Sequence, residues 1–172
     1  MTSEVKPIQE GFHTITASLV VNDAVKAIEF YKTALGAQEL LRSPAPDGRI
    51  MHAELKVGDS IFFLNDEFPD FASPEQAEFC TASPVKLGGR TGSIILSVEN
   101  ADNWFDRAVA AGAKVVMPMA DAFWGDRFGM VVDPFGHAWA FSTHVRDVTP
   151  EELEQAAAQL FSQPDGKAAG SQ

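Results

Sequence analysis

The hydrophobic positions near the start of the chain change from a two-residue period to a helical one. From Thr14 to Val21, small polar residues alternate with apolar ones, which predicts a strand. Asn22 and Asp23 then provide good helix N-cap residues, and an apolar stripe follows at three- and four-residue spacing. The stripe comprises Val25, Ile28, Phe30, Tyr31 and Leu35, and it stops at Gly36, a typical C-cap. The pattern therefore predicts a strand followed by an amphipathic helix.

Three further strands follow, and the whole order then returns. Strands are predicted over residues 37–41, 49–57 and 60–64, the last two joined as a hairpin. The second series is a strand at 92–98, a helix with Trp104 and Phe105 on its apolar side, a strand at 114–117 and a hairpin at 123–141. Leu19 falls on Leu96, an offset of 77 residues (96 − 19 = 77). We therefore predict an α+β fold of paired βαβββ modules, which form a curved, half-barrel mixed sheet with outer helices.

The last hairpin has one bulky face and one small face. Its turn, Asp133-Pro134-Phe135-Gly136, is typical of a tight turn, because proline presets φ and glycine tolerates the backbone that follows. After the turn, Trp139 and Phe141 alternate with small residues, which are Ala138, Ala140 and Ser142. Such a strand packs a helix with its aromatic face and leaves room for a guest molecule beside the small one.

The remaining segments divide the chain into six parts. We expect a leader at 1–12, the first module at 13–65, a connecting loop at 66–90, the second module at 91–144, a C-terminal helix at 145–162 and a disordered tail at 163–172. Thr149, Pro150 and Glu152 mark the start of the last helix as N-cap, first helical residue and capping-box partner. The connecting loop contains Phe68, Phe71 and Phe79, which suggests that it folds back over its own domain, a partner subunit or a ligand.

Charge and composition exclude several classes of partner. The chain has 172 residues and a formal net charge of −11, so its field repels nucleic-acid phosphates and anionic lipids. We therefore predict no nucleic-acid partner and no membrane partner. The sequence contains no apolar run of the roughly 18 residues that a spanning helix needs and no signal-peptide pattern, which makes the cytoplasm the expected location. Cys80 is the only cysteine, so no internal disulfide forms, and we interpret this thiol as a loop residue.

The paired modules, the turn Asp133-Pro134-Phe135-Gly136-His137 and the sequence Trp124-Gly125-Asp126-Arg127 resemble the vicinal oxygen chelate superfamily of glyoxalases, bleomycin resistance proteins and dioxygenases. Over residues 14–161 the chain looks most like its PhnB-like branch. The superfamily includes metal-dependent isomerases, epimerases, extradiol dioxygenases and thiol transferases, and also metal-free proteins that sequester drugs. Because the drug-binding relatives are commonly dimers, the resemblance also implies a homodimer.

The resemblance implies where a metal ion would be held. Catalytic members place a ligand, typically His or Glu, on the first and last strands of each module. These positions fall on Thr16 and Ser93 in the first strands and on Phe62 and Ala140 in the last strands. A hydroxyl is a weak neutral ligand and Phe and Ala offer no donor, whereas a catalytic ion needs roughly three protein ligands. We therefore predict a cavity that uses no metal or other cofactor.

His52 and Glu54 keep an enzymatic alternative open, because residues two apart on a strand share a face. If the pair holds a divalent metal, the third ligand would come from His137, His144, Asp126 or Glu99. Without metal, His52 as base and Arg127 as oxyanion partner would support acid/base chemistry. The alternative function is thus a divalent-metal-dependent or acid/base lyase, isomerase or dioxygenase. The structural alternative is that His52 and Glu54 belong to a polar strand face.

Trp124 and Arg127 also have two interpretations. As site residues, Trp124 is an aromatic wall and Arg127 is a cation for a carboxylate, phosphonate or enolate. As structural residues, Asp126 and Arg127 pin the start of the strand through local hydrogen bonds and Trp124 plugs the mouth of the cavity. We predict binding of a small, partly aromatic or anionic molecule, and the sequence indicates no particular catalytic residue. The predicted ligand-binding residues are Thr16, Ser18, His52, Glu54, Phe62, Ser93, Trp124 and Arg127. A dimer whose cavity is filled by its own side chains is the remaining, non-catalytic alternative.

Overall fold

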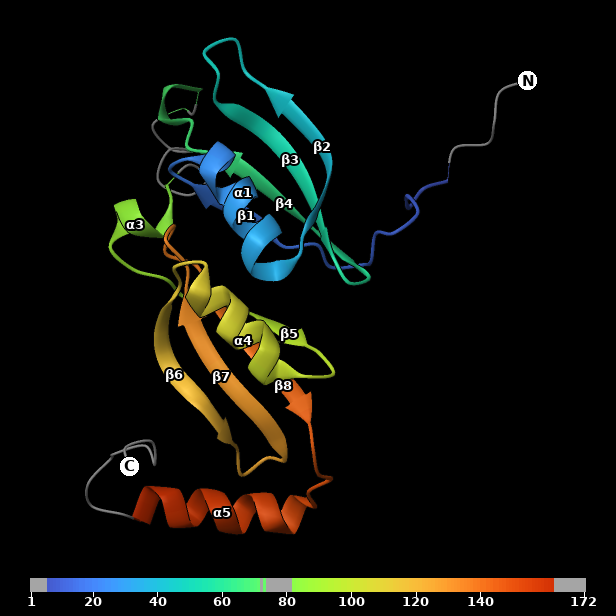
Figure 1. Cartoon of the computed structure of the whole chain (residues 1–172), viewed down its shortest axis with the longest axis vertical. Helices are drawn as coiled ribbons and strands as arrows, with labels where there is room; N and C mark the ends of the chain where they lie inside the picture. The colour runs from blue at the N-terminus through green and yellow to red at the C-terminus, as the bar shows by residue number, and fades with distance from the viewer. Residues whose placement is uncertain (1–5, 72, 74–81, 163–172) are drawn as a thin grey trace. The chain divides into compact units, whose positions relative to one another are not determined.

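The computed structural model describes residues 6–71, 73 and 82–162, and the chain divides into two compact units, unit 1 at 1–90 and unit 2 at 91–172. Each unit contains a four-stranded open sheet with a helix across one face (Figure 1). The predicted α+β fold of repeated βαβββ modules is confirmed. The predicted disordered tail at 163–172 and the loop residues Phe79 and Cys80 lie outside the described residues.

Unit 1 has the strand order β1-β4-β3-β2, and its helix α1 covers one face. The elements are β1 (Ser18–Val21), α1 (Ala24–Leu35), β2 (Gln38–Pro44), β3 (Ile50–Val57) and β4 (Ser60–Asp66). β1 runs parallel to β4, whereas the other neighbours are antiparallel. The first strand begins at Ser18, four residues later than the alternation predicts. On the covered face, Tyr31 of α1 meets Phe62 edge-on, with ring centroids 5.6 Å apart, so the core lies between α1 and this face.

The connecting segment contains more structure than the predicted loop. It includes η1 (Pro69–Phe71), a 3-10 helix, and the short helix α3 (Pro84–Leu87). Glu67, just beyond β4, accepts the backbone N–H of buried Ser83 at 2.7 Å. This hydrogen bond holds the end of the connecting segment close to the end of β4.

Unit 2 repeats the architecture with the strand order β5-β8-β7-β6. Its elements are β5 (Ser93–Ser97), α4 (Ala101–Ala110), β6 (Lys114–Asp121), β7 (Asp126–Val132) and β8 (Ala138–His144). The predicted turn is held by buried Asp133, which accepts the N–H groups of Phe135 and His137, both at 2.9 Å. The second oxygen of Asp133 accepts the indole N–H of Trp139 at 2.8 Å. The turn and the aromatic side of β8 are therefore fixed by one carboxylate.

In both units, a side-chain oxygen at the end of the last strand accepts the first backbone N–H of the main helix. In unit 1 the buried carboxylate of Asp66 accepts the N–H of Ala24 at 2.7 Å and the N–H of Ile50 at 2.6 Å. In unit 2 the hydroxyl of Thr143 accepts the N–H of Ala101 at 2.8 Å and donates to the carbonyl of Val98 at 2.8 Å. Both pairs keep the 77-residue offset of the repeat (101 − 24 = 143 − 66 = 77). Helix and sheet are thus joined in the same way twice, with a different side chain each time.

The C-terminal helix α5 (Pro150–Ser162) begins with the predicted capping box. Glu152 accepts the N–H of Thr149 at 2.9 Å, and Thr149 accepts the N–H of Glu152 at 3.3 Å. The segment before the helix is tied to β7 by Gly125, whose carbonyl accepts the N–H groups of Val145 and Arg146. A Cβ atom at Gly125 would overlap the carbonyl oxygen of Arg146, which explains why this position requires glycine. Within the described part of the chain, no helix is long and apolar enough to cross a membrane.

Candidate functional site

The face of each sheet that lies opposite its helix is called the open face here. In unit 2 the pairing of β5, β8 and β7 arranges the open face in rows across the strands. The rows are Ser93, Ala138 and Val132; Ile95, Ala140 and Met130; Ser97, Ser142 and Phe128; and His144 and Asp126. The other face is covered by α4, because Phe105 of α4 meets Phe141 of β8 edge-on at 6.3 Å. The bulky and small faces of β8 therefore have the predicted roles.

An aromatic ledge, defined as Phe123, Trp124 and Phe128, lies where β7 begins. The ring centroids of Phe123 and Trp124 are 5.1 Å apart, and those of Trp124 and Phe128 are 5.4 Å apart, both in edge-to-face contact. Phe123 and Trp124 remain 38% and 37% exposed, although aromatic side chains gain most from burial. The ledge thus offers ring surface to a further apolar or aromatic group.

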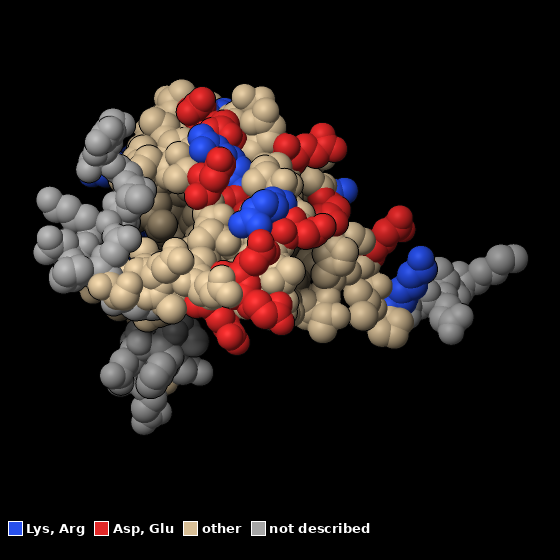
Figure 2. Space-filling model, turned by 90° about the horizontal axis from the view of Figure 1, so that it is seen from below, with Lys and Arg blue, Asp and Glu red and all other residues tan. Residues whose placement is uncertain are grey.

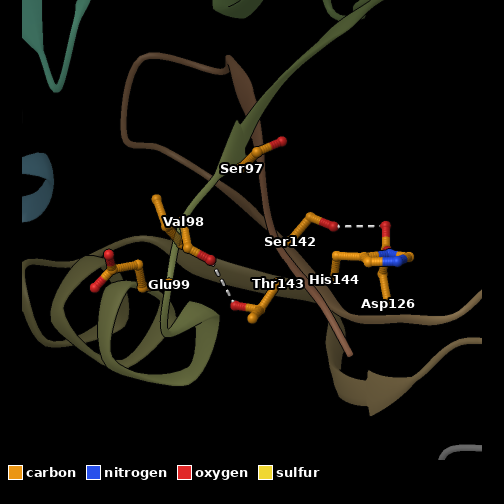
Figure 3. A pocket seen from close by; sticks show the side chains of 7 residues that line it. All are labelled: Ser97, Val98, Glu99, Asp126, Ser142, Thr143 and His144. Carbon is orange, nitrogen blue, oxygen red and sulfur yellow. Dashed lines mark hydrogen bonds and ion pairs between the residues drawn. The ribbon is translucent and has the colours of Figure 1, made fainter. Parts of the chain in front are cut away.

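A depression of about 670 Å³ lies at the polar end of the same unit. It is lined by Ser97, Val98, Glu99, Asp126, Ser142, Thr143 and His144. In Figure 3 the side chains of Ser142, Asp126 and His144 gather on one side of β8, while that of Glu99 points away from them. The depression adjoins the ledge, because Ser142 pairs with Phe128 across the strands. Polar groups and aromatic rings therefore meet on one open face.

Ser142 and His144 both contact the carboxylate of Asp126. Ser142 donates to Oδ2 of Asp126 at 2.8 Å, and Nδ1 of His144 lies 2.9 Å from Oδ1. The other ring nitrogen of His144 lies 3.1 Å from Asp147. Because Ser142 is bonded to the carboxylate and not to the imidazole, the arrangement does not activate a serine nucleophile.

These contacts shift both titrations. The hydrogen bond with His144, supported by Ser142, holds the pKa of Asp126 below its ordinary value. Asp126 and then Asp147 raise the pKa of His144. The cluster thus favours an ionised carboxylate beside a charged imidazolium, and its net charge becomes more negative when the imidazolium loses its proton.

The open face of unit 1 is partly occupied by the chain's own N-terminal segment. Phe12 packs on Phe63 of β4 with ring centroids 5.7 Å apart, and His52 meets the same ring at 4.8 Å. His52 Nε2 lies 3.3 Å from Oε1 of Glu54, so the predicted pair does share a face. Because Phe63 stands between two other rings, this face has less free ring surface than the ledge of unit 2.

Most of the predicted site residues are on the open faces or beside them. Ser18 is exposed on β1, opposite Phe63, and Ser93 is exposed on β5. Thr16 is half-buried in the segment before β1. Trp124 belongs to the ledge, and His52 and Glu54 form the pair described above.

Two of the predicted residues face the wrong way. Phe62 points to α1, where it meets Tyr31, and the open-face residue of β4 at this level is Phe63. The expectation was wrong by one residue, and a one-residue slip in a strand inverts every assignment.

Arg127 points to α4 and not to the open face. Its guanidinium contacts Asp102 at 2.7 Å and Asp121 at 3.4 Å. These contacts agree with the interpretation of Arg127 as a structural residue at the start of the strand. They give no support to a role as oxyanion partner beside His52.

The residues at the superfamily's metal positions do not fit an ion. On the open faces these positions carry Ser93, Phe63 and Ala140, while Thr16 precedes its strand. Within the described ranges, no three His, Cys, Asp or Glu side chains converge as a metal site. The donor set is too poor for a divalent cation, which needs roughly three protein ligands.

The sequence analysis considered His144 only as a third ligand for the His52–Glu54 pair, and it considered Ser142 only as a small residue of its strand. A usable signal exists in the hairpin. The turn centres on Phe135, so residues at equal distances from it pair, as Asp126 does with His144 and Phe128 with Ser142. Extending the predicted turn outward would have placed these four side chains on one face.

The fold and the repeat define a two-module protein of the glyoxalase type. The sequence model of the Glyoxalase/Bleomycin resistance protein/Dioxygenase superfamily matches residues 11–141, and the chain belongs to this superfamily. The Mycobacterium bovis protein Mb0911c is 41% identical over 152 residues, which cover 88% of this chain and 95% of that protein.

Solved structures agree with this assignment. TioX from Micromonospora sp. ML1 is 30% identical with a TM-score of 0.59, covering 76% of this chain and 98% of TioX. A PhnB protein from Bacillus cereus is 19% identical with a TM-score of 0.56, covering 76% of this chain and 99% of that one. At this identity the PhnB likeness reports the fold alone.

Proposed function

We propose that the chain is a ligand-binding member of its superfamily that holds a small, partly aromatic molecule on the open face of unit 2 without a metal ion. The observation that carries the proposal is the half-exposed ledge of Trp124 and Phe128 beside the depression at Ser97, Ser142 and Asp126. Ligand sites commonly combine aromatic walls with a few convergent polar groups. An aromatic guest on the ledge gains about 0.5–1.5 kcal/mol per ring pair beyond its area burial.

Two matched serine variants test where the ligand binds. Ser97→Phe fills the depression from β5, whereas Ser93→Phe adds the same ring on the same strand and open face outside it. Both serines are exposed on an edge strand, so an aromatic residue is tolerated at either position. We expect Ser97→Phe to weaken binding of the neutral fluorophore N-phenyl-1-naphthylamine at least tenfold, and Ser93→Phe to leave it unchanged.

The opposite pattern would move the site to the sequence-predicted residue Ser93. Equal binding by both variants and the parent chain would reject the open face of unit 2 altogether. Native mass spectrometry of the parent protein from its own host then identifies the guest that it retains.

The His52–Glu54 pair is the observation that favours an enzyme as second candidate. Glu54 is only 19% exposed and orients one nitrogen of His52, which is 38% exposed and lies against Phe63. An oriented, partly exposed imidazole is a candidate base. Metal analysis of protein purified without chelators decides between metal-free binding and metal-dependent chemistry. One equivalent of divalent ion in the parent chain, lost in His52→Ala, would establish the metal-dependent alternative.

A homodimer is part of the proposal, because apolar residues of the open faces are exposed. Ile95 and Met117 of unit 2 are 57% and 41% exposed, and Leu41 of unit 1 is 45% exposed. Apolar surface of this kind is commonly covered by a partner. We expect the Ile95→Glu variant to contain a larger fraction of monomer than the parent chain in sedimentation velocity. Val25→Glu is the control, since Val25 is 43% exposed on α1, away from the open face. A parent chain that sediments as a monomer at high concentration would contradict the dimer.

A further inference from the structure

Three described basic residues of unit 2, Arg127, Arg146 and Lys114, do not place their charge at the aromatic ledge. Arg127 is on the α4 side of the sheet, where Asp102 and Asp121 bind it. Arg146 directs its guanidinium to Glu152 of α5, at 3.5 Å. Lys114 pairs with Val132, six residues along β7 from Asp126, which corresponds to about 20 Å. These three basic side chains of unit 2 are therefore either paired elsewhere or distant from Asp126.

The charged groups that remain at the ledge are acidic in sum. Asp126 lies on the same face of β7 as Phe128, two residues before it. His144 contacts Asp126 from β8, and Asp147 contacts His144 from the segment before α5. Even with a charged imidazolium, two carboxylates and one cation leave a net negative charge. Figure 2 shows that carboxylate residues also cover more of the visible surface than basic ones, as the net charge of −11 implies.

Aromatic rings beside a carboxylate form a recognised environment for an organic cation. The negative faces of Trp and Phe rings attract a positive charge, and a nearby carboxylate adds direct attraction. The same environment repels a carboxylate or a phosphonate, because Arg127 and Arg146 of unit 2 direct their guanidinium groups to other carboxylates. An anionic guest, one of the classes that the sequence suggested, is thus disfavoured by the position of Arg127.

We infer that the ligand of this open face carries a positive charge, as a protonated aromatic amine or an alkylammonium group on an aromatic ring, which lies between the ledge and Asp126. The inference rests on the proposed function, since it assigns the charge of the guest at the same site. It makes Asp126 a specificity-determining residue and leaves ring binding to Trp124 and Phe128.

Three probes that share a naphthalene ring and differ in the charge of its substituent test the inference with the full chain. They are 1-naphthylmethylamine, which is a cation at neutral pH, 1-naphthylmethanol, which is neutral, and 1-naphthoate, which is an anion. Isothermal titration calorimetry at low ionic strength is expected to give at least tenfold tighter binding for the cation than for the anion. Raising the salt concentration should reduce this ratio, because exposed charges are screened.

Matched carboxamide variants locate the preference. Asp126→Asn should remove most of the cation preference and leave binding of the neutral probe within about twofold. Asp106→Asn, at an exposed position of α4, changes the net charge equally and should leave the ratio intact. Asp147→Asn is a second, milder variant at a fully exposed position and should lower the ratio partially.

The possible outcomes distinguish a wrong charge assignment from a wrong proposed function. If the anion binds best, or if the two variants at positions 126 and 106 behave alike, the charge assignment is wrong while ligand binding stands. If a folded parent chain binds none of the three probes at millimolar concentration, both the proposed function and the charge assignment fail.

Discussion

Arg127→Ala distinguishes a ligand-binding arginine from one that holds the sheet to its helix. In the structure the guanidinium makes three contacts with the carboxylate of Asp102, at 2.7, 3.1 and 3.2 Å, and a longer one with Asp121. These contacts connect β7 to the first turn of α4. Removal of the side chain should therefore loosen the helix on the sheet and leave the open face unchanged.

The expected loss of stability follows from exposure. The side chains of Arg127 and Asp102 are 32% and 47% exposed, so water screens the pair. Exposed ion pairs contribute about 0.2–1 kcal/mol, and the two-nitrogen geometry places this pair near the upper end. We expect Arg127→Ala to lower the free energy of unfolding by about 1 kcal/mol, which would shift the urea midpoint by roughly half a molar unit or less.

A double-mutant cycle with Asp102→Ala isolates the pair. The coupling energy should be about 0.5–1 kcal/mol in urea unfolding followed by circular dichroism. In the same variants, affinity for N-phenyl-1-naphthylamine and 1-naphthoate should stay within twofold of the parent chain. A tenfold loss of 1-naphthoate binding in Arg127→Ala, with little loss of stability, would refute this reasoning and restore Arg127 as an anion-binding residue.

The helix-starting contacts and His144 provide three further tests. Asp66→Ala leaves two buried N–H groups without a partner and should lower the free energy of unfolding by roughly 2–5 kcal/mol. Thr143→Val leaves one N–H group without a partner and should cost less, about 1–3 kcal/mol. Equal losses in denaturant unfolding would contradict this comparison. Because the pKa of His144 is raised above its ordinary value of about 6.5, its stabilising contribution is complete below that pH and is lost as pH rises through the folded-state pKa. The stability difference between the parent chain and His144→Gln should therefore shrink from pH 5.5 to pH 8.5, and a constant difference would argue against the ion pairs of His144. Over the same range, calorimetric affinity for 1-naphthylmethylamine should rise as the imidazolium disappears, while that for 1-naphthylmethanol stays constant; parallel changes for both probes would exclude His144 as the cause.

Local patterns in the sequence were sufficient for the repeated architecture. The alternation at Leu19 and Val21, the N-cap at Asp23 and the capping box at Thr149 each depend on residues a few positions apart. Such signals act through backbone hydrogen bonds and side-chain spacing, which need no knowledge of the rest of the chain. The small and bulky sides of β8 were predictable for the same reason.

Contacts between elements decided the candidate site. Phe62 and Arg127 were expected on the open faces, yet Tyr31 of α1 and Asp102 of α4 hold them on the covered ones. In a short strand either register satisfies the local pattern, and only packing against the helix selects one of the two faces. The pairing of Asp126 with His144 and of Phe128 with Ser142 follows from extending the predicted turn outward, whereas the hydrogen bonds of Ser142 and His144 to the carboxylate of Asp126 were decided by the tertiary structure.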